Sequence, residues 1–279
     1  MTIKLIKYLN LIILLLAASA VYAETTNCTA ITSIPYKITE PGVYCLTGNL
    51  SLGKVTGRAI FIDADDVVLD LNGWTLEGTG GLATLLVGIK AYQRKNITIR
   101  NGTIRGFYRA IYLADLPPYT TSQGHLIEDI HADSITYMGI QVFGRVNTVR
   151  RNQLGDTGGS TVNQWAIGIY LRGAEGRVLN NDISSTVATG SGEARGVYLG
   201  NASGAVVEGN RINDVSRDTG FAYGIIIVSS SYDVLFRGNS ITSADFGIRY
   251  VASTGKYMDN LTSNVTAPFL GGTAVGINN

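Results

Sequence analysis

Apolar and polar positions follow a short phrase that recurs from residue 59 to the end of the chain. The phrase is a small residue, an aliphatic residue, a variable residue and an apolar residue, as in GIYL at residues 168–171. Its copies start at residues 59, 88, 110, 139, 168, 196, 224 and 247, with a truncated copy at 276, so they are 22 to 29 residues apart. Side chains alternate sides along a strand, so the second and fourth positions should point inward and the third outward. A period in the twenties predicts a solenoid, in which each repeat buries its apolar face against its neighbours.

Each repeat contains two further apolar positions. A second apolar pair, such as Val178 and Leu179, follows the phrase, and a third anchor, such as Ile183, comes shortly after it. Strands this short are expected to stack on the equivalent strands of the next repeat. The pattern therefore predicts an all-β chain of three short parallel sheets in about nine coils. The rod would be about 40 Å long at about 4.8 Å per coil.

A column rich in asparagine lies two residues before the third anchor. It consists of one glycine and four asparagines, namely Gly102, Asn152, Asn181, Asn210 and Asn239. The backbone groups of a buried turn must find hydrogen-bond partners, and stacked Asn amides supply them from coil to coil. We therefore interpret this column as structural.

These phrases and this column resemble the right-handed parallel β-helix family with PbH1-type repeats, the pectin-lyase-like superfamily. The resemblance covers about residues 58–279. It implies a single-stranded right-handed parallel β-helix with a groove along the sheet of the recurring phrase. It specifies the activity poorly, because the fold carries lyases, hydrolases, epimerases, adhesins and periplasmic accessory proteins.

The chain before residue 58 divides into two parts. Residues 1–23 have a basic start with Lys4 and Lys7, an apolar run and small residues ending at Ala23, which is typical of a secretory signal peptide. Residues 24–57 are expected to form the N-terminal cap of the solenoid, and residues 58–279 the parallel β-helix. Cys28 and Cys45 are the two cysteines of the chain, and in an oxidising compartment we expect them to form a disulfide.

The charge balance excludes one class of partner. Of the 22 basic residues, Lys4 and Lys7 leave with the signal, so 20 remain against 21 acidic residues, a formal charge of −1. A nucleic-acid-binding protein would need a basic stripe, so we expect no nucleic-acid partner. With the signal removed, no membrane span is expected, and the protein should be secreted or periplasmic.

Candidate chemistry lies at the outward third position of the phrase. That column is Phe61, Lys90, Tyr112, Gln141, Tyr170, Tyr198, Ile226 and Arg249, and Arg109, Arg172 and Arg195 lie at the strand ends beside it. Tyr rings give flat faces for sugar rings, and Arg forks suit carboxylates. We assign catalytic roles to Tyr112, Tyr170, Lys90, Arg172 and Arg249. We assign substrate binding to Gln141, Tyr198, Arg109 and Arg195. The alternative is that the Tyr column only packs, under loops that fold over it.

Several other sites are weakly supported. The column contains no Asp or Glu, whereas glycoside hydrolysis usually needs two carboxylates. The Asp-Pro-His motif of mannuronan epimerases with this fold is absent, since none of the five prolines precedes a His. His125 and His131 are expected to be structural, because they have no Cys or third His beside them. No cofactor is expected, although the acidic turn at residues 63–66 could bind Ca²⁺ through oxygen ligands.

The sequence thus favours a secreted protein acting on an acidic, uronic-acid polysaccharide along the outward Tyr column. A lyase fits best, because it needs only a base and a cation beside the reacting carboxylate. The alternatives are a non-catalytic carbohydrate-binding, adhesin-like or structural protein of the cell envelope, and a periplasmic accessory protein similar to the NosD group. An enzyme should bring a base and a cation together at one coil, whereas a binding protein should spread its contacts evenly.

Overall fold

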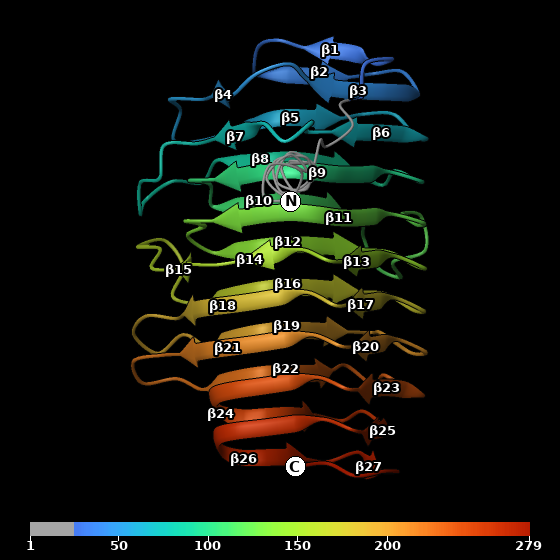
Figure 1. Ribbon diagram of the computed structural model, residues 1–279, viewed down its shortest axis with the longest axis vertical. Coiled ribbons are helices and arrows are strands. Elements are labelled where there is room, and N and C mark those ends of the chain that lie inside the picture. The colour runs from blue at the N-terminus through green and yellow to red at the C-terminus, as the bar shows by residue number, and fades with distance from the viewer. Residues whose placement is uncertain (1–24) are drawn as a thin grey trace, which may run out of the picture.

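The computed structural model describes residues 25–279 as three parallel sheets wound into one right-handed helix of strands (Figure 1). The first sheet carries the recurring phrase. Its strands are β2 (Tyr36–Ile38), β5 (Arg58–Ile62), β8 (Val87–Tyr92), β10 (Arg109–Ala114), β12 (Met138–Phe143), β16 (Ala166–Arg172), β19 (Ala194–Gly200), β22 (Ala222–Val228) and the second halves of β24 (Ser240–Tyr250) and β26 (Leu261–Leu270).

The second and third sheets complete each coil. The second consists of β1 (Thr29–Ile31), β3 (Gly42–Leu46), β6 (Val67–Asp70), the first halves of β9 (Thr98–Arg105) and β11 (Leu126–Asp133), β13 (Thr148–Arg150), β17 (Arg177–Leu179), β20 (Val206–Glu208), β23 (Val234–Arg237), β25 (Gly255–Met258) and β27 (Thr273–Ala274). The third consists of β4 (Leu50–Ser51), β7 (Thr75–Glu77), the second halves of β9 and β11, β14 (Gln153–Leu154), β15 (Thr157–Gly158), β18 (Asp182–Val187), β21 (Arg211–Ser216) and the first halves of β24 and β26.

The register of the first sheet follows the phrase from coil to coil. Ile140 pairs with Ile169 and Ile169 with Val197, and all are fully buried. Gln141 pairs in the same way with Tyr170 on the outer side. The inward and outward positions predicted from alternation are therefore confirmed, and one continuous apolar core runs along the axis.

The asparagine column forms a buried hydrogen-bonded ladder at the entry to the third sheet. Asn181 accepts from the backbone N–H and side-chain amide of Asn152, at 3.0 and 2.9 Å. It donates in turn to Asn210 Oδ1 at 2.9 Å and to the Val149 carbonyl at 3.0 Å. Gly102 occupies the same column at a coil where a Cβ would lie 2.3 Å from the Leu71 Cβ, so no side chain fits there. The predicted structural role of the column is confirmed, and the ladder extends beyond it to Asn260.

The segment expected to be a cap continues the ladders of the helix. β1 pairs with β3, β2 with β5 and β4 with β7, all in parallel. Cys28 and Cys45 form the predicted disulfide across this segment, with their Cα atoms 5.8 Å apart. The predicted signal peptide at residues 1–23 lies outside the described residues.

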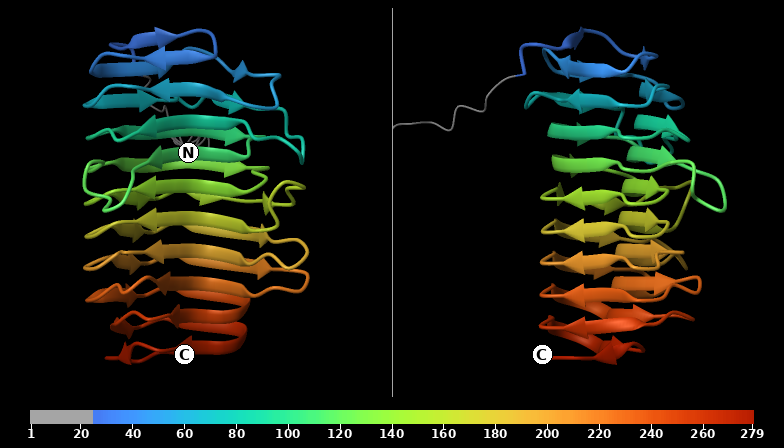
Figure 2. Two further views of the ribbon diagram at one scale, coloured as in Figure 1. Left: turned by 180° about the vertical axis from the view of Figure 1, so that it is seen from behind. Right: turned by 90° about the vertical axis from the view of Figure 1, so that its right-hand side faces the viewer.

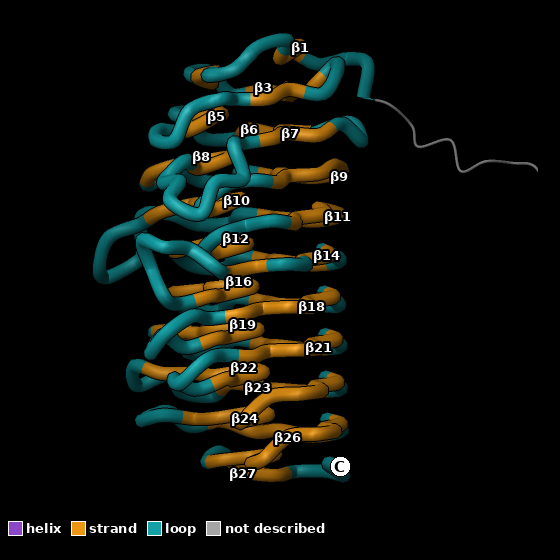
Figure 3. Tube along the Cα trace, turned by 90° about the vertical axis from the view of Figure 1, so that its left-hand side faces the viewer, coloured by secondary structure: helices purple, strands orange, loops and turns teal. Residues whose placement is uncertain are grey.

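The long connections lie on one side of the helix. They join the third sheet to the first at residues 78–86, 159–165, 188–193 and 217–221, and the first to the second at residues 115–125. Figures 2 and 3 show these loops projecting beside the first sheet, whereas the turns between the second and third sheets are short. The described chain contains no helix, and hence none that could cross a membrane.

Candidate functional site

Three cations gather on the outer face of the first sheet at β5, β8 and β10. They are Arg58, Lys90 and Arg109, which we call the cationic cluster. Arg58 and Arg109 both pair in register with Val87, on either side of it, and Lys90 lies in the adjacent outward column. None of the three forms an ion pair with a carboxylate within residues 25–279. The cluster therefore presents uncompensated positive charge on this face.

Aromatic rings hold the cations of the cluster in place. The guanidinium of Arg109 lies 4.9 to 5.0 Å from the ring centroids of Tyr108, Tyr112 and Tyr137. Lys90 Nζ lies 5.5 Å from the Tyr112 ring. Contacts of this kind attract the cation to the face of the ring. Arg109 Nε is itself buried without a hydrogen-bond partner in the structure.

Lys90 is the titrating group of the cluster. Partial burial, followed by the charges of Arg58 and Arg109, lowers the pKa of its amine below the ordinary Lys value. A lowered pKa raises the fraction of neutral amine, the form that can accept a proton. Tyr112 lies beside Lys90 in register and is half-buried, so its hydroxyl can serve the same reacting group.

The middle of the first sheet is covered by side chains from the loops. Tyr119 from the loop at 115–125 packs with Phe143 and Tyr170 in a second apolar cluster outside the main core. Asp115 holds this loop, since its carboxylate accepts from the backbone N–H groups of Leu116, at 2.9 Å, and of Thr121 and Ser122, both at 3.1 Å. The outward column is thus sheltered here rather than open.

Gln141 and Tyr170 lie under that cover. Gln141 is 5% exposed, and its Oε1 has no hydrogen-bond partner. Tyr170 is 9% exposed and stacks on Tyr198 with ring centroids 4.3 Å apart. Burial, and then the neighbouring Tyr198 phenol, raises the pKa of Tyr170. Tyr170 is therefore poorly suited to act as a base.

The remaining arginines of the face are engaged by neighbours. Arg172 lies 4.5 Å from the Tyr119 ring and donates to Asn201 Oδ1. Arg195 lies between Trp165 and Tyr198, 4.3 and 4.0 Å from their ring centroids, and pairs with Glu193.

Arg249 belongs to a separate aromatic group at the far end of the sheet. It donates to the Tyr223 hydroxyl at 2.9 Å and lies over the Phe246 ring. Six coil steps separate β24 from β8, which is about 29 Å at about 4.8 Å per step. Lys90 and Arg249 therefore cannot act on one bond.

A family comparison agrees with this architecture. The model described as "Right handed beta helix region" matches residues 87–266, well over half of the chain. The chain belongs to the right-handed beta helix family. No curated protein matches it at a significant level.

Several solved structures share the right-handed beta helix. The enzymatically active domain of tailspike protein 2 from bacteriophage CBA120 is 17% identical, with a TM-score of 0.62 over 85% of this chain and 38% of its own. DFA-IIIase from Arthrobacter chlorophenolicus A6 is 11% identical, with a TM-score of 0.51 over 80% of this chain and 63% of its own. A mutant tailspike of E. coli bacteriophage HK620 is 10% identical, with a TM-score of 0.50 over 85% of this chain and 58% of its own. This chain thus spans less than two thirds of each of them, and the likeness concerns the fold.

The structure divides the predicted site residues of this beta helix into groups. Lys90, Tyr112 and Arg109 lie together, and Gln141 follows Tyr112 in register. A second group contains Tyr170, Arg172, Tyr198 and Arg195, and Arg249 stands apart from both. Arg58 was missed from the sequence, although Arg58-Ala59-Ile60 repeats the triplet Arg109-Ala110-Ile111, a signal that could have identified it.

Three carboxylates at the edges of the first sheet, those of Asp63, Glu193 and Asp245, pair with nearby cations instead of facing one another. Asp63 binds Lys37 and Arg94, and these hydrogen bonds, that from Lys37 first, lower its pKa. Glu193 pairs with Arg195, and Asp245 binds Arg217 at 2.8 Å. No pair of free carboxylates faces the outward column within the described part of the chain.

The acidic turn at residues 63–66 also has partners of its own. Asp65 accepts from the Lys95 N–H at 2.9 Å, and Asp66 accepts from the Asn96 amide at 2.8 Å. Residues 25–279 contain no group of three or more His, Cys, Asp or Glu side chains placed to hold a metal ion.

The two histidines have different surroundings. His125 is 1% exposed, accepts from the Ile97 N–H at Nδ1 (3.2 Å), and therefore donates from Nε2 to Ser122 Oγ (2.7 Å). Burial lowers the pKa of His125 to about 4. His131 is half-exposed and lies 3.3 Å from both Gln153 and Asp133. His125 thus has the structural role expected of it, and neither histidine faces the outer side of the first sheet.

Proposed function

We propose that this protein binds an acidic polysaccharide along the outer face of the first sheet and cleaves it as a lyase at the cationic cluster. The observation that carries the proposal is the meeting of three unpaired cations and a Tyr at one place on the face. Two structures with this fold are the enzymatically active domain of a phage tailspike and DFA-IIIase in complex with GF2, which supports activity on glycans. The disulfide and the signal-like sequence support a secreted or periplasmic location.

The reaction assigns one role to each side chain. Arg109 and Arg58 bind the uronate carboxylate and stabilise the negative charge that develops when the adjacent proton leaves. Neutral Lys90 takes that proton as its pKa is lowered toward the working pH. The electron pair forms a carbon–carbon double bond, and the bond to the glycosidic oxygen breaks. The Tyr112 hydroxyl protonates the departing oxygen, and Lys90 returns the proton to Tyr112.

The test is a panel of uronate polymers followed by the ultraviolet absorbance of the unsaturated product. Wild type should produce the signal with at least one polymer, and Lys90→Met should lose it by at least about a hundredfold, the contribution typical of a general base. Tyr170→Phe is the matched variant on the same face and should retain activity. The lyase assignment would be excluded if wild type gave no unsaturated product with any polymer, or if Lys90→Met were fully active.

A non-catalytic carbohydrate-binding protein is the second candidate. The observation in its favour is that aromatic and cationic side chains extend over many coils, most of them already engaged with one another. Polymer binding without product by wild type, weakened equally by changes at Arg109 and Arg249, would favour this function.

A further inference from the structure

The far end of the first sheet carries an exposed aromatic surface. Phe221, Tyr223 and Phe246, together the aromatic platform, come from the loop before β22, from β22 and from β24. The Tyr223 and Phe246 rings stack at 5.2 Å, and Phe221 meets the Phe246 ring edge-on at 5.8 Å. Phe221 is 50% exposed, whereas Tyr223 is 3% exposed. An apolar ring therefore faces solvent above a rigid aromatic base.

The structure holds Phe221 in this exposed position. The Phe221 carbonyl accepts from the Ala194 N–H at 2.9 Å. The next residue, Ala222, donates its N–H to Asp245 at 2.8 Å. Asp245 is itself fixed by two hydrogen bonds from Arg217, at 3.0 and 2.8 Å. The exposed ring therefore offers a flat apolar face, on an aromatic base, that a ligand can contact.

Two of the three arginines around the platform are paired with acids, unlike the three cations of the cationic cluster. Glu193 pairs with Arg195, and Asp245 pairs with Arg217. Arg249 lies over Tyr223 and Phe246, and Asp218, which accepts from the Gly190 N–H, adds one negative charge nearby. A carboxylate meets one unpaired cation here, Arg249, instead of the three of the cationic cluster, whereas the apolar face of an uncharged sugar ring can stack on the exposed Phe221 ring.

The platform continues the same outer face. Arg195, Tyr223 and Phe246 occupy one outward column of adjacent strands, next to the column that leads from Lys90 to Arg249. The cationic cluster and the platform therefore lie along one face of the sheet. We propose that the aromatic platform is a subsite for an uncharged sugar, and that the ligand is a heteropolysaccharide that combines uronate and neutral units. This inference rests on the proposed function and specifies its substrate class.

The experiment measures binding with Lys90→Met protein, so that the polymers stay intact. Hyaluronan and gellan, which contain uronate and uncharged sugars, are compared with alginate and polygalacturonate, whose units are all uronates. We expect tighter binding of a mixed polymer. Phe221→Ala should weaken that binding about tenfold, as expected for the loss of one stacking ring, and Phe221→Trp should restore it. Tyr232→Ala is the matched control, because Tyr232 is 54% exposed and lies outside the platform.

The outcomes separate this inference from the function on which it rests. Unchanged affinity of Phe221→Ala, or an equal loss for mixed and all-uronate polymers, overturns the uncharged-sugar subsite and leaves the lyase proposal standing. Circular dichroism of each variant excludes unfolding as the cause of a loss. Wild-type protein that binds none of the polymers overturns both proposals.

Discussion

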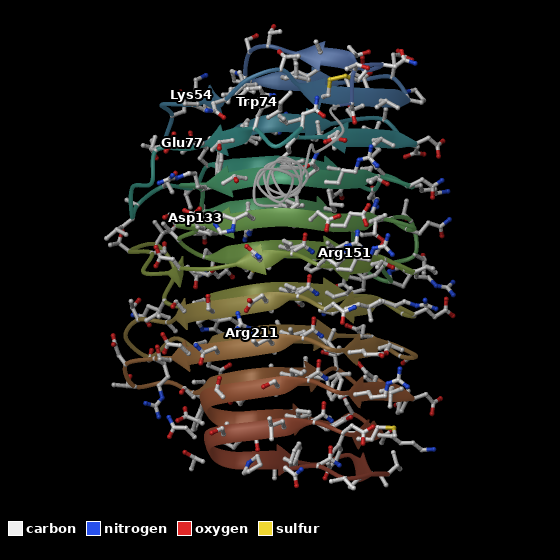
Figure 4. The ribbon with its side chains drawn as sticks, in the orientation of Figure 1. Lys54, Trp74, Glu77, Asp133, Arg151 and Arg211 are labelled. Atoms are coloured by element: carbon white, nitrogen blue, oxygen red, sulfur yellow. A yellow bond between two sulfur atoms is a disulfide. The ribbon has the colours of Figure 1, made fainter. Side chains whose placement is uncertain are left out.

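Charged side chains have different neighbours on the outer face of the first sheet and on the outer faces of the other two sheets. On the second and third sheets an acid on one coil faces an Arg on the next, as with Asp70 and Arg100 at 2.9 Å or Glu128 and Arg150 at 2.8 Å. Figure 4 shows the third-sheet side, with Glu77, Asp133 and Arg211 on its strands and Arg151 at the corner. On the first sheet the cations of the cationic cluster have aromatic neighbours and no acid.

This difference separates structural charges from charges available to a ligand. Ion pairs between stacked coils satisfy both partners, and those in which both side chains are exposed add little stability. Unpaired cations on one rigid face repel one another, an unfavourable arrangement that an anionic ligand would relieve. Perturbed pKa values together with such clusters mark functional-site candidates. The same contrast yields predictions that differ between the two regions.

The largest expected effect on stability concerns the buried asparagine ladder at the entry to the third sheet. Asn181→Ala should lower the free energy of unfolding by about 3 to 5 kcal/mol. It removes the acceptor of the buried Asn152 backbone N–H and of one Asn152 amide N–H, and the donor to the Val149 carbonyl. Denaturant unfolding measures the loss. Asn213→Ala is the matched control, since Asn213 belongs to the same side of the helix but points outward, and it should cost much less. Equal losses for the two variants would contradict the ladder as a source of stability.

The next effect is a dependence of folding stability on pH, caused by His125 at the turn between the first and second sheets. His125 has a pKa of about 4 in the folded protein, below its ordinary 6.5, so the unfolded chain binds the extra proton first. Stability should therefore be complete above pH 6.5 and should fall by about 3 kcal/mol as the pH drops from 6.5 to 4. Thermal unfolding across this range measures the change. His125→Asn keeps an acceptor for the Ile97 N–H and should reduce the pH dependence, whereas an identical profile would assign it to other groups.

The sequence predicts the apolar core and the asparagine ladder well, because the same short-range contacts recur in every coil. Each coil needs the same inward aliphatic residues and the same Asn, so the register of Ile169 and the ladder at Asn181 can be read directly from the spacing. The arrangement of side chains on the outer face of the first sheet depends on the long loops beside it. Tyr170 packs in one cluster with Tyr119, which comes from a loop outside the repeat pattern, and Asp115 fixes that loop. Spacing carries no information about such contacts, so the sequence grouped side chains that the structure separates.

A smaller effect is expected within the cationic cluster. After burial, the charge of Arg58 contributes most to lowering the pKa of Lys90, ahead of that of Arg109. Arg58→Gln should raise that pKa and move the rising limb of the pH–activity profile to higher pH, because less neutral amine is present at a given pH. Arg105→Gln, which removes an Arg that faces Glu77 and Asp133 on the third sheet, is the control and should leave the limb in place. A shift for both variants would indicate a general change in charge, not a local one.

The smallest effect is expected where the charges are paired and exposed. Arg211 on β21 faces Asp182 on β18, and its side chain is 71% exposed. Arg211→Ala should leave the unfolding midpoint within experimental error, because solvent and salt screen such pairs. Polymer binding should also be unchanged, whereas Arg109→Ala should weaken it and reduce its dependence on salt. If Arg211→Ala weakened binding as much as Arg109→Ala, the division between a structural side and a ligand-facing side would be wrong, and the glycan would have to reach the third sheet.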